Sequence, residues 1–479
     1  MNHAIIRNII FRVLEFQAAF LMLPFLVALI YKENAGWDYL AVAGGCFLIG
    51  FIGKLKKPAS NVLYAREGFV AVSLSWIVLS LTGALPFFLS GEIPSYTDAL
   101  FETISGFTTT GSSILTDVEA LSYCNIFWRS FTHWIGGMGV LVLILSVLPL
   151  AGSYNMHLMR AESPGPSVGK LVPRVKKTAQ ILYGIYIVMT VILIVLLLCT
   201  GMDLFSSLTI SFGTAGTGGF AILNDGCASY STAAQIIITI FMILFGVNFN
   251  VYYLFLIRRP KEAICHEEMR YYLGVILASI LLITFNTREL FSGFWEAFQQ
   301  AAFQVGSIIT TTGYATTDFT KWPMFSQTIL VLIMFCGACA GSTGGGIKVS
   351  RFLILAKTAK NEISHLLHPK RVKPVRIEGH IVTQETWRSV QVFFFVYIGI
   401  FALSLLLVSL CNLDFATNFS AVAATLNNIG PGIGLVGPMG NFSVFSDPAK
   451  WVLMFDMLAG RLELFPMLVL FAAPFWKRG

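Results

Sequence analysis

The segment YTDALFETISGFTTTGSS, residues 96–113, has a pattern that returns three times further along the chain. Each copy begins with an acidic residue, continues for about three turns of helix-compatible sequence and ends in a polar tetrapeptide that contains glycine. The other copies are MDLFSSLTISFGTAGTGGF at 202–220, FWEAFQQAAFQVGSIITTTGYA at 294–315 and LDFATNFSAVAATLNNIGPG at 413–432. The acidic residues are Asp98, Asp203, Glu296 and Asp414. Because a repeated unit decides a fold before any single motif does, these four segments are the starting point.

The composition of the chain is that of a protein in a lipid bilayer. Of its 479 residues 56% are hydrophobic and 12% are charged, whereas soluble domains carry about 25% charged residues. Several apolar runs approach or exceed the ~20 residues that a spanning helix needs, and a further run, 271–285, is shorter. The longer runs are 5–30, 37–53, 68–90, 126–150, 179–199, 233–257, 324–357, 389–411 and 448–474.

None of the four repeated segments is long or apolar enough to span, and each lies between two spanning runs. Backbone outside a helix is tolerated at membrane depth only where protein buries it or where it lines a watery cavity. The sequence therefore predicts an all-α polytopic membrane protein, with four pseudo-repeated helix, pore-loop, helix units around one pore. The predicted parts are two extra peripheral helices in 1–60 and pore repeats in 61–165, 166–262, 263–375 and 376–479.

Basic residues predict the orientation, because Lys and Arg collect on the cytoplasmic side of a membrane. With ten spans, alternate loops and the two ends hold 26 of the 32 basic residues, so both termini should be cytoplasmic. The opposite side is assigned fourteen acidic residues and five basic ones, Lys32, Arg129, Arg288, Lys321 and Lys450. Such a face attracts cations. The net charge of +7 therefore gives no reason to expect nucleic acid binding.

The polar ends of the repeats have the chemistry of an ion filter. An ion that leaves water needs its hydration shell replaced by oxygens, and rings of backbone carbonyls do this in potassium filters. Glycine permits a backbone with φ > 0, and the aligned glycines are predicted to be Gly111, Gly218, Gly313 and Gly430. Each short helix also aims its partially negative C-terminal end at the pore centre. The predicted filter residues are Thr109, Thr110, Gly111, Ser112, Gly216, Thr217, Gly218, Gly219, Thr311, Thr312, Gly313, Tyr314, Asn428, Ile429, Gly430 and Pro431.

The run CGACAGSTGGG at 336–346 interrupts the apolar stretch 324–357. Each glycine costs about 1 kcal/mol in a helix interior relative to alanine, so a break is expected here. The interpretation is a mobile intramembrane gate made of Gly341, Ser342, Thr343, Gly344, Gly345 and Gly346. The alternative is a patch of small residues for close helix packing.

Arg461 is the one basic residue that the sequence places well inside a span, and intramembrane charges usually face a cavity or a partner. Asp456 and Glu463 stand five and two residues away, off its helix face, so pairing within the helix is not expected. We expect Arg461 to belong to the gate. At roughly 5 Å and an effective dielectric near 20 it would repel a passing cation by about 3 kcal/mol. The alternative is a structural ion pair with another helix.

Two nucleotide-like motifs are rejected. In 341–348 the lysine follows the glycines one residue too late for a phosphate-binding loop, and GIGLVG at 432–437 follows no strand. No nucleotide site is therefore expected in this chain. Clusters of His, Asp, Glu or Cys that would suggest an enzyme are absent from the spans. Cys336 and Cys339 are interpreted as packing residues, and whether Cys124 and Cys227 meet is left open.

The sequence resembles the TrkH, KtrB and HKT superfamily of cation transporters, and most closely its TrkH branch. The resemblance covers essentially the whole chain. It rests on the four loops and on HWIGGMGVLVLILSVLPL at 133–150, RAESPGP at 160–166, GSTGGGIKVSR at 341–351 and GRLELFP at 460–466.

The resemblance implies potassium uptake across a bacterial inner membrane, with potassium ions held at filter carbonyls. It also implies a homodimer with one pore per subunit, contact with membrane lipid and a cytosolic ring of nucleotide-binding TrkA-type subunits. Glycine rather than serine at Gly111 favours potassium, while Ile429 and Pro431 make the fourth loop unlike the others. Two other function classes have different sequence signatures. A coupled transporter moving potassium with protons or sodium should show ionisable residues near the midplane, and a membrane enzyme should show a catalytic cluster.

Overall fold

The computed structural model describes residues 2–55, 65–139, 175–368 and 374–472. These residues are almost entirely helical, and the only strands among them form one short antiparallel hairpin, β1 (Arg376–Ile377) and β2 (His380–Ile381). The predicted all-α fold is therefore confirmed. Two of the segments on which the resemblance rests, 160–166 and the part 140–150 of 133–150, lie outside the described residues.

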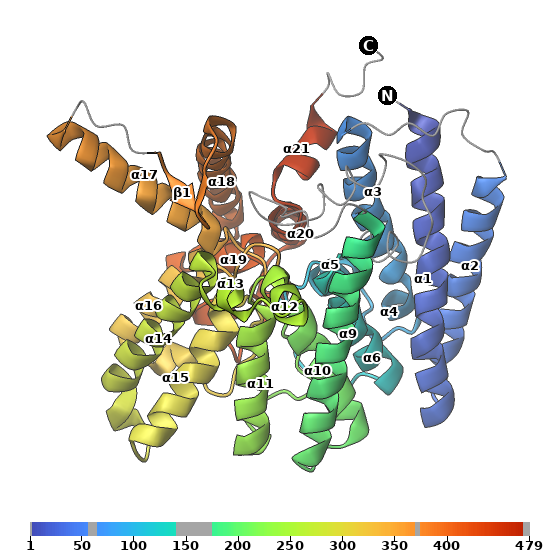
Figure 1. The fold of residues 1–479 in the computed structure, drawn as a ribbon. Coiled ribbons are helices and arrows are strands. Elements are labelled where there is room, and N and C mark those ends of the chain that lie inside the picture. Colours follow the sequence, from blue (N-terminus) through green and yellow to red (C-terminus); the bar gives the residue numbers. More distant parts are fainter. Residues whose placement is uncertain (1, 56–64, 140–174, 369–373, 473–479) are drawn as a thin grey trace.

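The first two helices form an antiparallel pair at one edge of the molecule (Figure 1). Helix α1 (His3–Tyr31) ends at Lys32, whose left-handed backbone (φ 60°) starts the return, and α2 (Gly36–Lys54) runs back along it. A Cβ at Gly50 would lie 2.8 Å from the carbonyl oxygen of Phe11, so a glycine permits this close approach. The pair corresponds to the two predicted peripheral helices.

Four units follow, each with an outer helix, a short re-entrant helix and an inner helix (Figure 1). The outer helices are α3 (Ala65–Gly83) with α4 (Leu85–Leu89), α9 (Val175–Cys199), α14 (Glu267–Thr287) with η1 (Arg288–Leu290), and α18 (Gln384–Val408) with η3 (Ser409–Cys411). The re-entrant helices are α5 (Tyr96–Phe107), α10 (Leu204–Gly216), α15 (Phe294–Ile309) and α19 (Phe415–Leu426). The inner helices begin with α6 (Tyr123–Gly137), α11 (Thr232–Phe245), α16 (Met324–Cys336) and α20 (Asp447–Arg461).

Short elements join these helices. The turn η2 (Phe319–Lys321) lies between α15 and α16, and the turns η4 (Gly434–Val436) and η5 (Phe442–Val444) lie between α19 and α20. The inner helices continue as α12 (Phe249–Leu256), α17 (Val349–Leu367) and α21 (Phe465–Phe471), and α13 (Pro260–Ile264) leads into the third unit. Helix α17 projects from the same side of the molecule on which α1 begins and α21 ends (Figure 1).

The inner helices are broken, which the sequence predicted for only one of them. The break after Cys336 is confirmed, because α16 ends there and α17 starts only at Val349. The prediction of one continuous span over 233–257 was wrong, because α11 and α12 meet at 90°. The prediction of one continuous span over 448–474 was also wrong. Glu463 and Leu464 have φ of 60° and 65°, and these two residues separate α20 from α21. Helix α6 ends at Gly137, within the apolar run 126–150.

Apolar side chains cover the outside of the helices as they would in a bilayer. Phe395 and Ile398 on α18 are 81% and 61% exposed, whereas large aromatic residues such as Trp76 and Trp128 are buried. Among the described residues six helices are long and apolar enough to cross a membrane, or seven if α11 and α12 count as one span. One of the six is α14, so the short run 271–285 belongs to a full-length helix.

Candidate functional site

The four loops at the ends of the re-entrant helices have one backbone conformation. In each loop a left-handed residue is followed two positions later by a glycine that also has φ > 0. The left-handed residues are Thr109 (54°), Thr217 (53°), Thr311 (61°) and Asn428 (55°). The glycines are Gly111 (78°), Gly219 (77°), Gly313 (87°) and Gly430 (101°). The residue between them donates its N–H to a carbonyl of the last helical turn, in the pairs Thr110 to Ser105, Gly218 to Gly213, Thr312 to Ser307 and Ile429 to Ala424.

This register corrects one part of the sequence alignment. Gly218 was aligned with Gly111, but its place in the hydrogen-bond pattern is that of Thr110, and Gly219 is the equivalent of Gly111. The second loop holds two adjacent glycines, so composition alone cannot choose between them. The backbone conformation identifies Gly219, because only Gly219 of the two has φ > 0. The fourth loop, despite Ile429 and Pro431, has the same pattern as the other three.

The four glycines close the loops into a ring. A Cβ at each of them would collide with the backbone carbonyl oxygen of the next loop in cyclic order. The pairs are Gly111 with Gly218, Gly219 with Thr312, Gly313 with Ile429 and Gly430 with Thr110. No side chain fits at these positions without moving a carbonyl of the neighbouring loop, so glycine is required by space as well as by φ.

Polar side chains tie the ring together, most densely between the first and fourth loops. Ser112 Oγ donates to the Gly430 carbonyl at 3.1 Å, and Asn428 Nδ2 donates to Thr110 Oγ1 at 2.9 Å. The Thr110 hydroxyl also lies 2.7 Å from that of Thr108. Among the described residues, the buried Thr109 hydroxyl has no hydrogen-bond partner.

The other predicted filter residues support the loops from behind. Gly216 ends α10 and packs against the His133 carbonyl, and Thr217 Oγ1 donates to the Gly216 carbonyl at 2.6 Å. The buried Tyr314 donates its hydroxyl to the Ile210 carbonyl of α10 at 3.2 Å. Pro431 stands 3.0 Å from the position of a Cβ at Gly313. The hydroxyl of Thr312 lies 2.7 Å from that of Thr310.

A polar cavity of about 140 Å³ opens directly outside the ring. All four ring glycines line it, together with Ser112, Tyr314, Asn224 and Asn441. The segment GIGLVG forms part of this outer wall, where η4 gives it a turn rather than the strand-to-helix geometry of a dinucleotide site.

The segment 341–346 lies on the inner side of the ring and touches it. Gly345 donates its N–H to Thr311 Oγ1 at 2.6 Å. A Cβ at Gly344 would lie 2.9 Å from the Thr310 carbonyl and one at Gly345 would lie 2.6 Å from the Asn427 carbonyl. Those carbonyls end α15 and α19, so this intramembrane loop occupies the partially negative ends of two re-entrant helices.

The two ends of the intramembrane loop are fixed by one buried carboxylate. Glu268 at the start of α14 accepts from the Ala340 N–H at 2.7 Å and from the Ser350 N–H at 3.2 Å. Lys348, which is 1% exposed, donates to the Gly344 carbonyl. The loop is therefore held at its stem, while its glycines form the tip beneath the ring.

Arg461 contacts this loop through backbone carbonyls. Its Nη1 donates to the Thr343 carbonyl at 2.8 Å, and its Nη2 donates to the carbonyls of Gly136 and of Gly137, the latter at 2.8 Å. The residue lies at the end of α20 rather than in the middle of a long helix. Of the two acidic residues nearest to it in sequence, Asp456 accepts from Ser404 and Glu463 pairs with Arg351.

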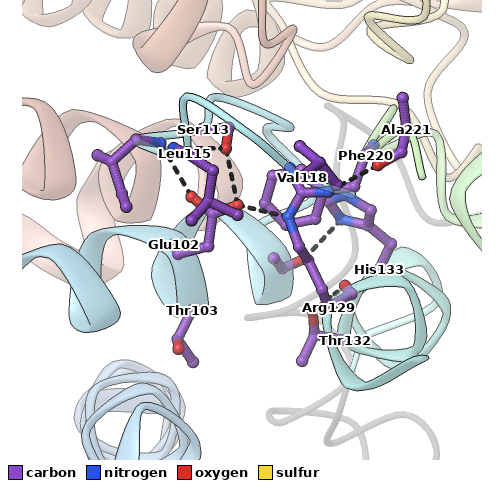
Figure 2. A network of polar contacts seen from close by, with 12 residues as sticks. Glu102, Thr103, Ser113, Leu115, Val118, Arg129, Thr132, His133, Phe220 and Ala221 are labelled. Atoms are coloured by element: carbon purple, nitrogen blue, oxygen red, sulfur yellow. Dashed lines mark hydrogen bonds and ion pairs between the residues drawn. The ribbon is translucent and has the colours of Figure 1, made fainter. Parts of the chain in front are cut away.

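Sequence reasoning missed the buried charges around the ring. Arg129 was assigned to the outer surface, and Arg461 was taken as the one basic residue inside a span. The structure instead places Arg129 within α6, 3% exposed and paired with Glu102 (Figure 2). His133 receives the Phe220 N–H at Nε2 (3.3 Å), so its Nδ1 carries the proton donated to the Gly106 carbonyl (2.8 Å). The only available signal was a charge within a few residues of a predicted span boundary.

The cysteines and acidic residues form no second site. All eight cysteines are free thiols, and Cys124 and Cys227 are both buried. The described residues contain no group of three His, Cys, Asp or Glu side chains that could hold a metal ion.

A membrane-embedded ring of four re-entrant loops with a loop beneath it defines a class of cation-conducting proteins. The sequence model of the TrkH family, described as cation transport protein, matches residues 41–288 and 293–478, so the chain belongs to that family. It is 37% identical over 466 residues to the Trk system potassium uptake protein TrkH of Escherichia coli K12, covering 95% of this chain and 96% of that protein. It is 34% identical over 462 residues to TrkG of the same strain, covering 95% and 94%. The crystal structure of the potassium transporter TrkH from Vibrio parahaemolyticus superimposes with a TM-score of 0.89 at 33% identity and covers 100% of both chains.

Proposed function

We propose that this chain takes up potassium ions through the ring of four loops. The observation that carries the proposal is the closed cycle in which each ring glycine abuts a carbonyl of the next loop. Four carbonyl-bearing loops around one axis offer an ion a set of oxygens in place of its water. Glycine at position 111 leaves room for the Gly218 carbonyl of the next loop. Both relatives compared above are named as potassium uptake proteins.

The intramembrane loop is the proposed gate. It rests against the inner carbonyl ends of α15 and α19, where an ion leaving the filter would pass. Its tip is six residues with four glycines, while its stem is held by Glu268. A loop of this kind can leave the path without unfolding its anchors. Arg461 holds the loop through the Thr343 carbonyl and adds a positive charge beneath the filter.

The assembly and setting are part of the same proposal. The protein is a homodimer in the bacterial inner membrane with both termini cytoplasmic, and a cytosolic TrkA-type ring that binds nucleotides regulates it. The side from which α17 projects is the side on which α1 begins (Figure 1), and 26 of the 32 basic residues belong to segments assigned to this side. No nucleotide site is proposed in this chain.

Flux from purified protein in liposomes tests the function. Potassium and proton gradients are imposed in opposite directions, and potassium, sodium and proton movements are recorded. We expect potassium to follow its own electrochemical gradient and to exceed sodium. Potassium driven uphill by the proton or sodium gradient would contradict a channel-like pathway and identify a coupled transporter.

A further inference from the structure

Two charged side chains lie sealed behind the first two filter loops. Glu102 on α5 and Arg129 on α6 are 1% and 3% exposed, and Arg129 Nε donates to Glu102 Oε1 at 2.5 Å (Figure 2). Taking such a pair out of water costs several kcal/mol per ion, so it requires good geometry and further hydrogen bonds. The remaining bonds of this pair all go to the filter loops.

Each partner holds one loop. Glu102 accepts from Ser113 Oγ and from the Ile114 N–H, both at 3.0 Å. Arg129 Nη1 donates to the Ala221 carbonyl at 2.7 Å, and its guanidinium carbon lies 3.8 Å from the centre of the Phe220 ring. Figure 2 shows both sets of contacts converging between the loops.

The contacted residues occupy equivalent places in the ring. Ser113 follows the glycine of the first loop by two residues, and Ala221 follows Gly219 by two residues. The third loop has Ala315 at this place, and its carbonyl accepts from the Cys227 N–H of the preceding repeat at 2.8 Å. The Ser113 carbonyl likewise accepts from the Phe442 N–H of the fourth repeat at 2.8 Å.

A donor from the preceding repeat thus meets the same carbonyl position at three junctions of the ring. At two of them the donor is a backbone N–H, and at Ala221 it is the Arg129 side chain. Arg129 therefore supplies with a guanidinium what the backbone supplies elsewhere. Because a guanidinium is planar with donors in fixed directions, it can set the distance between two loops, and Glu102 fixes its orientation.

We propose that the Glu102–Arg129 pair is a positioning element that sets the spacing of the first and second filter loops and thereby the preference for potassium over sodium. The inference rests on the proposed function of the ring. Selectivity depends on where the carbonyl dipoles stand and how many reach the ion. A pair that holds the residues just beyond two of the four glycines acts on that arrangement without touching the ion.

The test compares two carboxylates on the same helix. Glu102→Gln keeps the shape of the side chain but replaces one carboxylate oxygen by an NH₂ group. Both oxygens of Glu102 accept hydrogen bonds, so the NH₂ group faces a donor. Asp98→Asn makes the same chemical change in the pair of Asp98 with Lys450 (2.5 Å), which joins α5 to α20 away from the filter loops. Potassium and sodium flux in liposomes and thermal stability are measured for both variants and for wild type.

We expect Glu102→Gln to lower the potassium-to-sodium flux ratio by about tenfold, as loss of an outer partner does for other ion sites. Asp98→Asn should leave the ratio unchanged whatever it does to stability. Arg129→Lys keeps the charge but not the planar guanidinium, so it should also lower the potassium-to-sodium flux ratio. If Glu102→Gln does not fold, the flux ratio of Arg129→Lys tests the inference in its place.

Equal losses of stability in the two carboxylate variants with an unchanged flux ratio would overturn the inference. So would an Arg129→Lys protein that keeps the wild-type ratio. Failure of the proposed function would look different, because the wild-type protein itself would then show no preference for potassium.

Discussion

The outer and inner halves of the pathway are built on opposite plans. On the outer side four loops of different sequence share one backbone conformation and close into a ring. On the inner side the second helices end differently: α11 bends by 90° into α12, α16 gives way to the intramembrane loop, and α20 ends at two residues with φ > 0. Coordination of an ion benefits from equivalent ligands around an axis, whereas a gate needs one element that can move alone. The predictions below alter one half and ask whether the other is affected.

The largest effect is expected from shortening the intramembrane loop. Deletion of residues 342–345 removes the N–H that Gly345 donates to Thr311 and the carbonyl that Arg461 binds. If the open state is normally a minor population, flux without the regulatory partner should rise roughly 10- to 1,000-fold. The potassium-to-sodium ratio should stay at its wild-type value, because no residue of the four ring loops is removed. Loss of flux in protein that remains folded would instead make the loop a structural support.

Gly111→Ser should disturb the outer half alone. Its Cβ would collide with the Gly218 carbonyl, and serine is strained at φ 78°. We expect the potassium-to-sodium flux ratio to fall by roughly 10- to 100-fold. Gly91→Ser is the matched control, since Gly91 has φ 75° and no atom within 4 Å of the new Cβ. Equal flux ratios in the two variants would remove Gly111 from the filter.

Arg461 tests whether the gate is held by charge or by hydrogen bonds. Arg461→Gln removes the charge and weakens the contacts to the carbonyls of Thr343, Gly136 and Gly137. Loss of a charged hydrogen bond is worth about 1.5 to 3 kcal/mol, so flux should increase by about tenfold. Arg461→Lys discriminates: a pure electrostatic barrier predicts wild-type flux, whereas a hydrogen-bonded latch predicts an increase. A destabilised Gln variant with no gain in flux would contradict both readings.

Asp414→Ala should have the smallest effect, and on stability only. Asp414 caps α19 by accepting from the Thr417 hydroxyl (2.6 Å) and N–H (2.9 Å), and loss of such a cap costs about 1 kcal/mol. These hydrogen bonds, the hydroxyl first, hold the pKa of Asp414 below its usual value of 3.8. The contribution is therefore complete above that value and lost as the pH falls through the lower folded pKa. Thermal denaturation between pH 3 and pH 7 should show the difference from wild type shrinking toward low pH, and a pH-independent difference would argue against this cap.

The repeats could be predicted because the features that make them are local. Three turns of helix-compatible sequence followed by a polar tetrapeptide that contains glycine leave a pattern in each copy, and a run of small residues cannot continue a helix. The bend between α11 and α12 left no such mark. It depends on one glycine, Gly246, and on Asn248, whose side chain caps α12, within an otherwise apolar run.

The conformation of the loops and the buried charges could not be predicted. Threonine rarely adopts φ > 0, so nothing in the sequence marked Thr109, Thr217 and Thr311 as left-handed. Asparagine adopts this conformation more often than most residues, but Asn428 follows a second asparagine, and composition alone does not choose between the two. Glu102 and Arg129 are 27 residues apart; Glu102 lies within the first repeated segment and Arg129 near the start of the apolar run 126–150. Counting charges by loop therefore placed both at the surface. Burial depends on how α5 packs against α6, which no local pattern records.

The ring of unlike loops has a consequence for how such a protein can change. In an assembly of four identical chains every substitution enters the ring four times, so even a mild one is multiplied around the axis. Here one chain supplies all four loops, and a change at Ile429 or Tyr314 alters a single quadrant. Small steps in ion preference are thus open to single mutations, and a weakened quadrant can later be compensated in its neighbour. The fourth loop, with isoleucine and proline where the first has threonine and serine, shows how much the side chains of one quadrant can differ while the backbone conformation stays the same.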